Sequence, residues 1–248
     1  MGTGTSNVGK RSGGSGGSGS KYKNFMKMTD DQKAQVISDI LNDDSIVVPN
    51  YLDNSEFTKV LYGLGMTEKP ELVSDAQLDA MSGTELFRTV YDNDDAGITT
   101  KDIYSQIAKG DYTVQSGQYS SAHGRSLYFA DDFTESTAYQ EGSGSKNLVM
   151  RAKLKSTAKV TTESALVGEI SRAARRGDKL AIECQSRGKS VLGLYALSKG
   201  YDAYTFYSYN MVVNRGALAM STTAKKLNNG GDYARTWSEC NGTKVNLK

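Results

Sequence analysis

The stretch at residues 124–139 constrains the fold more than any other part of the chain. It contains a short aromatic segment, Leu127–Ala130, which suits a half-buried strand. Asp131 or Asp132 can cap a helix that begins directly after this strand. Glu135 would then lie in the first turn of the helix, where a negative charge is favourable. The stretch therefore predicts a strand, an acidic turn and a helix in immediate succession.

Side chains from this stretch can converge on one point. Ser136 and Tyr139 are three positions apart, so they share a face of the predicted helix, and Tyr128 lies in the preceding strand. Two aromatic rings and a small hydroxyl group suit a flat, polar ring that must be stacked and hydrogen-bonded, such as a pyridine that carries an amide. The sequence leaves one alternative open, an ordinary strand-turn-helix unit with tyrosines in its core.

The same residues resemble the nicotinamide-pocket motif of ADP-ribosyltransferases of the poly(ADP-ribose) polymerase and diphtheria-toxin type. That motif reads Gly-x-Gly-[Ile/Leu]-Tyr-Phe-Ala, followed by a Ser and a Tyr at the spacing found here. The resemblance implies that Tyr128 and Tyr139 sandwich the nicotinamide of NAD and that Ser136 bonds its carboxamide. Ser126 departs from the motif, because the family usually has Gly there, and a side chain restricts close backbone approach.

A second resemblance involves the segment 85–91, whose alternation predicts a strand. Arg88 lies in its middle, on the same face as Leu86 and Val90, where a charge needs a partner. In ADP-ribosyltransferases the first core strand carries an Arg or a His that binds the ribose or phosphate of NAD. Arg88 resembles the Arg version of the clostridial toxins, so the chain combines features of two classes. The alternative is an edge-strand arginine that faces water.

Residues 209–217 resemble the third motif of the family, a strand of the form Glu-x-[Ile/Val]-[Leu/Val]-x-Arg-Gly-[Thr/Ala]. The position that matches the catalytic Glu is Asn210, and an amide can bond a ribose hydroxyl but carries no charge. We therefore expect weak transferase activity unless another acid reaches the site. The resemblance implies catalytic roles for Arg88 and Asn210, and it places the NAD contacts at Arg88, Thr89, Gly124, Tyr128, Phe129, Ala130, Ser136 and Tyr139.

The resemblance spans roughly residues 85–220 and implies an α+β fold of the ADP-ribosyltransferase type. In that fold two packed, mixed or antiparallel sheets form an NAD cleft, with flanking helices. Residues 1–22 are rich in Gly, Ser, Lys and Arg, which is typical of a disordered tether. We expect a helical lead-in at 23–80, either packed on the core or forming a small accessory lobe, and an ADP-ribosyltransferase-like domain at 81–248.

Hydrophobic periodicity and capping residues predict further elements. Helices are expected at 29–42, 54–63, 74–81, 98–109, 164–176 and 191–199, and strands at 147–154, 158–161, 180–184, 202–206 and 209–214. Gly188-Lys189-Ser190 follows one of these strands and weakly resembles a phosphate-binding loop that lacks its first Gly. Trp237, in a polar and Gly-rich C-terminal region, is the expected docking anchor of that region.

Composition narrows the range of partners. The net charge of +2 implies no strong field toward nucleic acid or membranes, and the lone histidine, His123, excludes zinc sites that need two imidazoles. No apolar run is long enough to span a bilayer. We thus expect no metal and no membrane partner, and a cytoplasmic or virion-associated location. The virion option comes from a weaker resemblance of Gly83–Arg88 and Tyr209–Leu218 to ADP-ribosyltransferase-like domains of phage proteins.

Three functions follow from the resemblance. The first is an NAD-dependent mono-ADP-ribosyltransferase, with NAD as substrate and an unidentified protein or nucleic acid as acceptor. The second is a module of the same fold with little or no catalysis, which binds NAD or serves as a phage virion or partner-docking protein. The third is an NAD glycohydrolase that uses water as acceptor.

Overall fold

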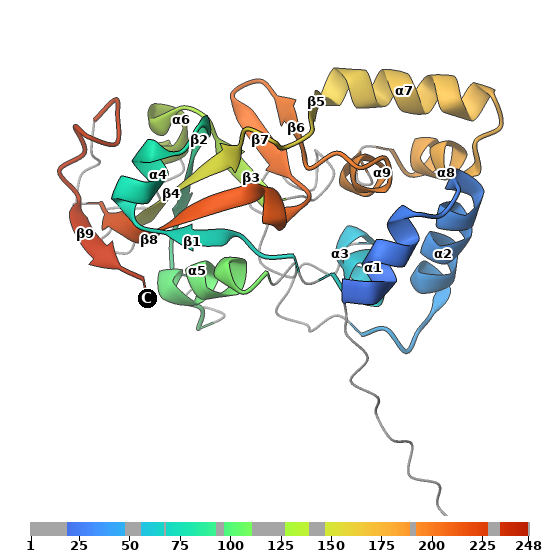
Figure 1. Ribbon diagram of the computed structural model, residues 1–248, viewed down its shortest axis with the longest axis horizontal. Helices are drawn as coiled ribbons and strands as arrows, with labels where there is room; N and C mark the ends of the chain where they lie inside the picture. Colours follow the sequence, from blue (N-terminus) through green and yellow to red (C-terminus); the bar gives the residue numbers. More distant parts are fainter. Residues whose placement is uncertain are drawn as a thin grey trace, which may run out of the picture.

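The computed structural model describes residues 19–47, 56–66, 68–92, 97–110, 127–138, 147–188, 192–227 and 234–247. In this part of the chain, helices surround a nine-stranded mixed sheet, so the fold is α+β (Figure 1). The helices are α1 (Gly19–Met26), α2 (Asp30–Asn42), α3 (Glu56–Gly63), α4 (Asp75–Ala80), α5 (Thr100–Ala108), α6 (Phe133–Thr137), α7 (Glu163–Arg175), α8 (Lys179–Arg187), α9 (Leu192–Ser198) and the short 3-10 helix η2 (Arg215–Ala217). The strands are β1 (Glu71–Val73), β2 (Gly83–Val90), β3 (Leu127–Ala130), β4 (Leu148–Lys155), β5 (Val160–Thr162), β6 (Ala203–Phe206), β7 (Tyr209–Val212), β8 (Leu218–Lys226) and β9 (Thr243–Asn246).

The sheet consists of two halves that meet at a narrow junction. Its strand order is β1-β8-β4-β2-β3-β7-β6-β5, with β9 paired to β8. β2 and β4 pair along their whole length, whereas the single register pair recorded between the described residues of β2 and β3 is Phe87 opposite Ala130. We call this junction, with β2 residues 87–90 and β3 residues 127–130, the seam. The expected two packed sheets are thus replaced by two halves of one sheet, because this pair keeps the hydrogen-bonded path continuous.

Alternation along the strands divides the side chains between two faces. On one face Leu86, Phe129 and Met150 pack against Ile103 and Ile107 of α5, which covers the sheet there. α5 lies within the predicted helix at 98–109. The opposite face of β2 carries Phe87 and Thr89 and is covered near the seam by α6.

The lead-in helices pack on the core. Phe25, Ile37 and Leu61 share one buried cluster with Leu166 of α7 and Leu180 of α8. Figure 1 shows α1 and α2 beside α8, at the end of the molecule away from β9. The lead-in also supplies β1, which pairs in parallel with β8. Of the two expectations for the lead-in, the packed arrangement is the one observed.

Local sequence signals explain most helix boundaries. Thr29, Ser74 and Thr99 each form a capping box at the start of α2, α4 and α5, as side-chain oxygens accept from backbone N–H groups. The predicted helices at 29–42, 74–81 and 98–109 are thereby confirmed within one or two residues, and α3 confirms the predicted helix at 54–63 over its described residues. The predicted tether extends too far, since α1 begins at Gly19, within the range assigned to it.

The segment 180–184 is a helix and not the predicted strand. Asp178 caps α8 by accepting a hydrogen bond from Ala181 N at 2.8 Å, and Leu180, Ala181 and Cys184 are buried at helical spacing. Gly188 adopts the positive φ of 70° that suits a glycine at a helix C-terminus. A phosphate-binding loop follows a strand, whereas the element that leads into Gly188 is the helix α8, so the phosphate-loop interpretation is wrong.

Candidate functional site

The seam brings together side chains from three separate segments of the chain. Arg88 lies on β2 directly after the last paired residue, where the strands separate. Its Nη1 donates a hydrogen bond to the carbonyl oxygen of Tyr128 on β3, at 2.7 Å. The guanidinium group thus bridges the two halves of the sheet at the point where strand pairing stops. The position agrees with the predicted mid-strand arginine on the face of Leu86 and Val90.

Burial and a like charge act on Arg88. Its exposed fraction is 7%, and burial followed by the nearby charge of Arg215 lowers the pKa of Arg88 to about 10. Arg215 itself is buried in η2, which directly precedes β8. Arg88 remains protonated at neutral pH, since its pKa is still well above that value. Two buried guanidinium groups in one region favour the approach of an anion.

Thr89 and Ser136 connect β2 to α6. Their hydroxyl oxygens are 3.1 Å apart, and Ser136 is 2% exposed. Asp132 fixes the start of this helix, because its Oδ1 accepts from Glu135 N at 3.0 Å. The predicted strand-turn-helix unit is therefore confirmed. It presents the Ser136 hydroxyl beside the strand that carries Arg88.

The ring of Tyr128 packs on a tyrosine that the sequence analysis did not select. Its centroid lies 4.7 Å from that of Tyr209, with the ring planes tilted by 33°. The Tyr209 hydroxyl donates to Glu135 Oε2 at 2.8 Å, which ties β7 to α6. Tyr139, the expected second ring of the sandwich, and Gly124 both lie outside the described residues, as does His123. The sequence signal that could have identified Tyr209 is its place directly before Asn210 in the third motif.

The other predicted residues on β3 have a packing role. Phe129 is completely buried in the apolar cluster under α5, and Ala130 forms the one pair across the seam. Neither side chain extends into open space. Their contribution to the candidate site is to hold the strand in place, since Phe129 also pairs with Asn210 of β7.

Asn210 occupies the position that matches the family's catalytic Glu, and it is 2% exposed. Its Nδ2 atom is buried and meets the geometry of a hydrogen bond with none of the described residues. Asp131, directly after β3, is the neighbouring ionisable group. Burial raises the pKa of Asp131, the Asn210 side chain partly opposes this, and Asp132 and Glu135 raise the pKa further.

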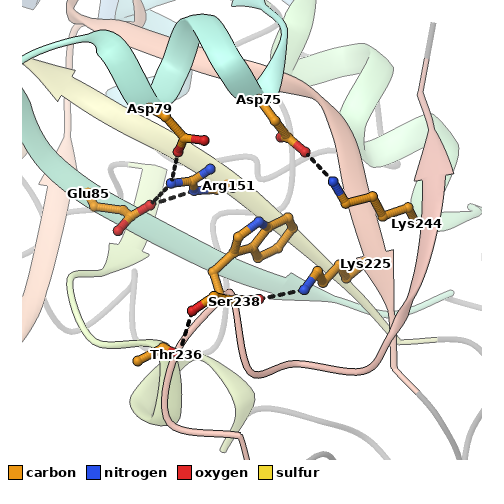
Figure 2. Close-up of a pocket in the computed structure, with 9 residues that line it drawn as sticks. Asp75, Asp79, Glu85, Arg151, Lys225, Thr236, Ser238 and Lys244 are labelled. Carbon is orange, nitrogen blue, oxygen red and sulfur yellow. Dashed lines mark hydrogen bonds and ion pairs between the residues drawn. The ribbon is translucent and has the colours of Figure 1, made fainter.

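A pocket of about 410 Å³ lies elsewhere, between α4 and the C-terminal segment (Figure 2). Arg151 forms ion pairs there with Asp79, at 2.5 Å, and with Glu85. Trp237 has the cations of Arg151 and Lys225 over its ring, at 5.6 and 4.9 Å from the centroid. The described lining includes none of the predicted NAD-binding residues; it consists of Asp75, Asp79, Glu85, Arg151, Lys225, Thr236, Trp237, Ser238 and Lys244.

The charges of this pocket are largely paired with one another. Lys244 bonds Asp75 at 3.1 Å, and Lys225 Nζ donates to the carbonyl oxygens of Trp237 and Cys240 at 2.5 and 2.6 Å. Trp237 also stacks on Phe87 with 6.3 Å between centroids. These contacts attach the C-terminal segment to the sheet, so Trp237 is the docking anchor that the sequence predicted.

Comparisons of the chain with known protein families, with curated proteins and with solved structures found no match. Within the described ranges, none of the helices has both the length and the apolar character required to cross a membrane. In the same ranges, no group of three or more His, Cys, Asp or Glu residues has an arrangement that could hold a metal ion. The class of protein defined by these findings is a mixed α+β fold with a polar site at the seam of its sheet.

Proposed function

We propose that the protein is an NAD-dependent mono-ADP-ribosyltransferase that acts on a protein or nucleic-acid acceptor. The observation that carries this proposal is that Thr89, Tyr128 and Ser136, which the family resemblance assigns to NAD, lie on one face of the sheet at the seam, while Arg88 contacts the Tyr128 backbone from the opposite face. Arg88 contacts the backbone of Tyr128 at 2.7 Å, and Thr89 contacts Ser136 at 3.1 Å. The two contacts join residues that are 40 and 47 positions apart in the sequence.

The proposed reaction, cleavage of the bond between nicotinamide and ribose, requires few chemical groups of the site. The bond between the nicotinamide nitrogen and ribose C1′ breaks, its electron pair leaves with nicotinamide, and positive charge develops on the ribose. The nucleophile of the acceptor then bonds C1′ and releases its proton to solvent. Catalysis of such a step depends on positioning and on negative charge near the ribose.

The seam residues supply the positioning. Arg88 keeps its charge at neutral pH and suits the phosphates of NAD, since guanidinium groups bond phosphate oxygens in pairs. The hydroxyls of Thr89 and Ser136 offer both a donor and an acceptor for the carboxamide. Tyr128 offers an aromatic face, which is now covered by Tyr209, so binding of nicotinamide requires the two rings to separate.

The second candidate is a module of this type with little catalysis, which binds NAD or serves as a phage virion or partner-docking protein. Asn210 is the observation that favours it. An amide at this position keeps a hydrogen bond but cannot stabilise positive charge, and loss of one such electrostatic group typically lowers a rate by about 10² to 10³.

Calorimetry with NAD tests the binding step. We expect the native protein to bind NAD with a Kd below the millimolar range, and Ser136→Ala to weaken binding by about fivefold, the usual effect of losing one hydrogen bond of about 1 kcal/mol. Ser198→Ala is a matched control, because Ser198 is also a buried serine but bonds Tyr195 O within α9. Absence of NAD binding at millimolar concentration would overturn the proposal.

Turnover distinguishes the candidates that bind NAD. NAD labelled in its adenylate part is incubated with the protein and with protein or nucleic-acid acceptors. Transfer of the label to an acceptor supports the transferase, and release of nicotinamide without transfer identifies a glycohydrolase. Binding without either reaction identifies the module.

A further inference from the structure

The pocket between α4 and the C-terminal segment has the size of a small-molecule site. Its volume of about 410 Å³ lies within the range of ~300–1,000 Å³ that is typical for such sites. The described lining contains three carboxylates and three basic side chains, together with hydroxyl groups and one indole ring. Each of the basic side chains bonds a carboxylate or a carbonyl oxygen of the protein. The pocket therefore favours a neutral, polar ligand over an anion or a cation.

Arg151 offers this pocket a hydrogen-bond donor that is already ordered. It is 8% exposed, its Nε donates to Glu85 Oε1 at 2.5 Å, and its Nη2 donates to Asp79 Oδ1 at 2.5 Å. Its third nitrogen, Nη1, bonds none of the described residues, and Figure 2 shows it pointing away from Glu85. A guanidinium group that two carboxylates hold in place loses little further entropy when a ligand binds it.

The two carboxylates that hold Arg151 have unused acceptors. Asp79 and Glu85 bond Arg151 through Oδ1 and Oε1, and the other oxygens, Oδ2 and Oε2, accept from none of the described residues. The two side chains are 58% and 38% exposed, so a ligand can reach them. A hydroxyl group both donates and accepts. Two neighbouring hydroxyls can therefore donate to the carboxylates and accept from Nη1, whereas a cation uses only the acceptors and an anion only the donor.

Trp237 adds an aromatic surface to these polar groups. Its side chain lines the pocket, is partly exposed, and stacks on Phe87 with 6.3 Å between ring centroids, so its orientation is fixed. The exposed hydroxyls of Thr236 and Ser238 lie on either side of it in the sequence, with their oxygens 3.1 Å apart. A sugar ring has an apolar C–H face and a rim of hydroxyls. The face suits an aromatic ring, and the rim suits polar groups around that ring.

We propose that this pocket binds a neutral carbohydrate ring, at a site separate from the seam. Neighbouring hydroxyls of the sugar donate to Asp79 Oδ2 and Glu85 Oε2 and accept from Arg151 Nη1. The apolar face of the sugar packs on Trp237. Because the sugar carries no charge, every ion pair of the pocket is retained when it binds.

Fluorescence of Trp237 tests this proposal, because it is the only tryptophan of the chain and therefore reports on this pocket. The protein is titrated with the methyl glycosides of glucose, galactose, mannose and N-acetylglucosamine. We expect a saturable change of emission with at least one of them, with a Kd in the millimolar range or below. Choline, inorganic phosphate and alanine serve as cationic, anionic and zwitterionic probes, and we expect no change with these.

The corresponding free sugar identifies the source of the ligand. A methyl glycoside has a substituted anomeric oxygen, as does a ring within a glycan. Binding of the methyl glycoside and the free sugar with equal affinity supports the site and indicates that a glycan can occupy it. Binding of the free sugar with higher affinity supports the site and indicates an unattached sugar.

Asp79→Ala tests the role of the unused acceptors. We expect it to weaken glycoside binding by about fivefold or more, the usual effect of losing one hydrogen bond. Asp79 is exposed and Arg151 keeps Glu85, so the melting temperature should change little. Asp39→Ala is the matched control, because Asp39 is also an exposed aspartate in a helix that accepts one side-chain hydrogen bond, from Gln35. It should bind the glycoside as the native protein does.

The results that would overturn the proposal differ from those that concern NAD. No response to any of the glycosides, or a response that Asp79→Ala leaves unchanged, overturns it. Binding of choline, phosphate or alanine in place of the glycosides also overturns it, because the pocket then selects charge. A saturable response of Trp237 to NAD that Asp79→Ala weakens would make the pocket part of the NAD site and overturn a separate sugar site. Absence of NAD binding overturns the proposed function alone.

Discussion

Arg88 shows how much a single side chain contributes at the seam. Where β2 and β3 stop pairing, its guanidinium group donates a hydrogen bond to the carbonyl oxygen of Tyr128. A side chain in this role is held in a fixed direction. A guanidinium group held in this way is already ordered when an anionic ligand arrives, which lowers the entropic cost of binding.

Replacement of Arg88 by Lys tests this role. Lys keeps the charge but loses the planar, forked donor group, so we expect NAD affinity to fall by about tenfold or more, in line with the ~1.5–3 kcal/mol of a hydrogen bond to a charged group. Arg151→Lys is the control: Arg151 is also buried on a central strand, but it pairs with Asp79 and Glu85. Equal losses of affinity in both variants, with equal losses of melting temperature, would show that Arg88 acts through stability alone.

The candidate site was partly predictable from single residues. Local signals predicted the strand-turn-helix unit that carries Tyr128 and Ser136, whereas only the family resemblance implied that Arg88 belongs to the same site. The contact of Tyr128 with Tyr209 was not predictable, since it depends on β7 pairing with β3 across about 80 residues of chain.

At the scale of elements, helices with strong caps were predicted well, whereas α1 and α8 were not predicted as helices. Capping boxes at α2, α4 and α5 fix the helix starts locally. The segment 180–184 was short and apolar, a pattern that fits a buried strand or a buried helix equally, and only its packing against α2 and α7 decides the outcome. The sheet order and the seam lay beyond prediction from periodicity, because non-local pairing leaves no local signal.

The docking of α2 on α9 depends on a buried lysine. Lys33 Nζ donates to Ser198 O at 2.6 Å and lies over the ring of Phe25, and burial lowers the pKa of Lys33 from its ordinary value of 10.5. The unfolded chain therefore binds the Lys33 proton at a pH where the folded protein has begun to release it. The contribution of Lys33 to the free energy of unfolding thus rises as pH increases through this window.

Lys33→Met provides the corresponding prediction. Met fills similar space and carries no charge to desolvate, so the stability of the native protein relative to the variant should increase as pH rises from the lowered pKa of Lys33 toward 10.5. Urea unfolding of both proteins at several pH values measures this difference. Lys27→Met is the control, because Lys27 is exposed and close in sequence. A pH-independent difference between native and Lys33→Met would contradict the expectation.

At the scale of the whole molecule, the first 18 residues should be dispensable for folding. They are rich in Gly and Ser and contain only two apolar side chains other than Gly, Met1 and Val8, so they have little apolar area to bury. A chain that begins at Gly19, the first residue of α1, should have the same melting temperature as the full chain. A further deletion through Met26 is the comparison, because it removes the fully buried Phe25 and should lower the melting temperature by several degrees. A large drop for the first deletion would mean that residues 1–18 contribute to the core.

The lead-in of the chain touches both halves of the sheet. Its helices share a buried cluster with Tyr128, Tyr204 and Met211 of the second half, while its strand β1 is paired to β8 in the first half. The lead-in therefore connects the two halves in addition to the contacts at the seam and under α5. A rigid-body movement of one half away from the other would therefore disrupt the contacts at the seam and those of the lead-in at the same time. We therefore expect a ligand to enter the seam through local movements of side chains. The first of these is the movement of the Tyr209 ring, which packs on Tyr128.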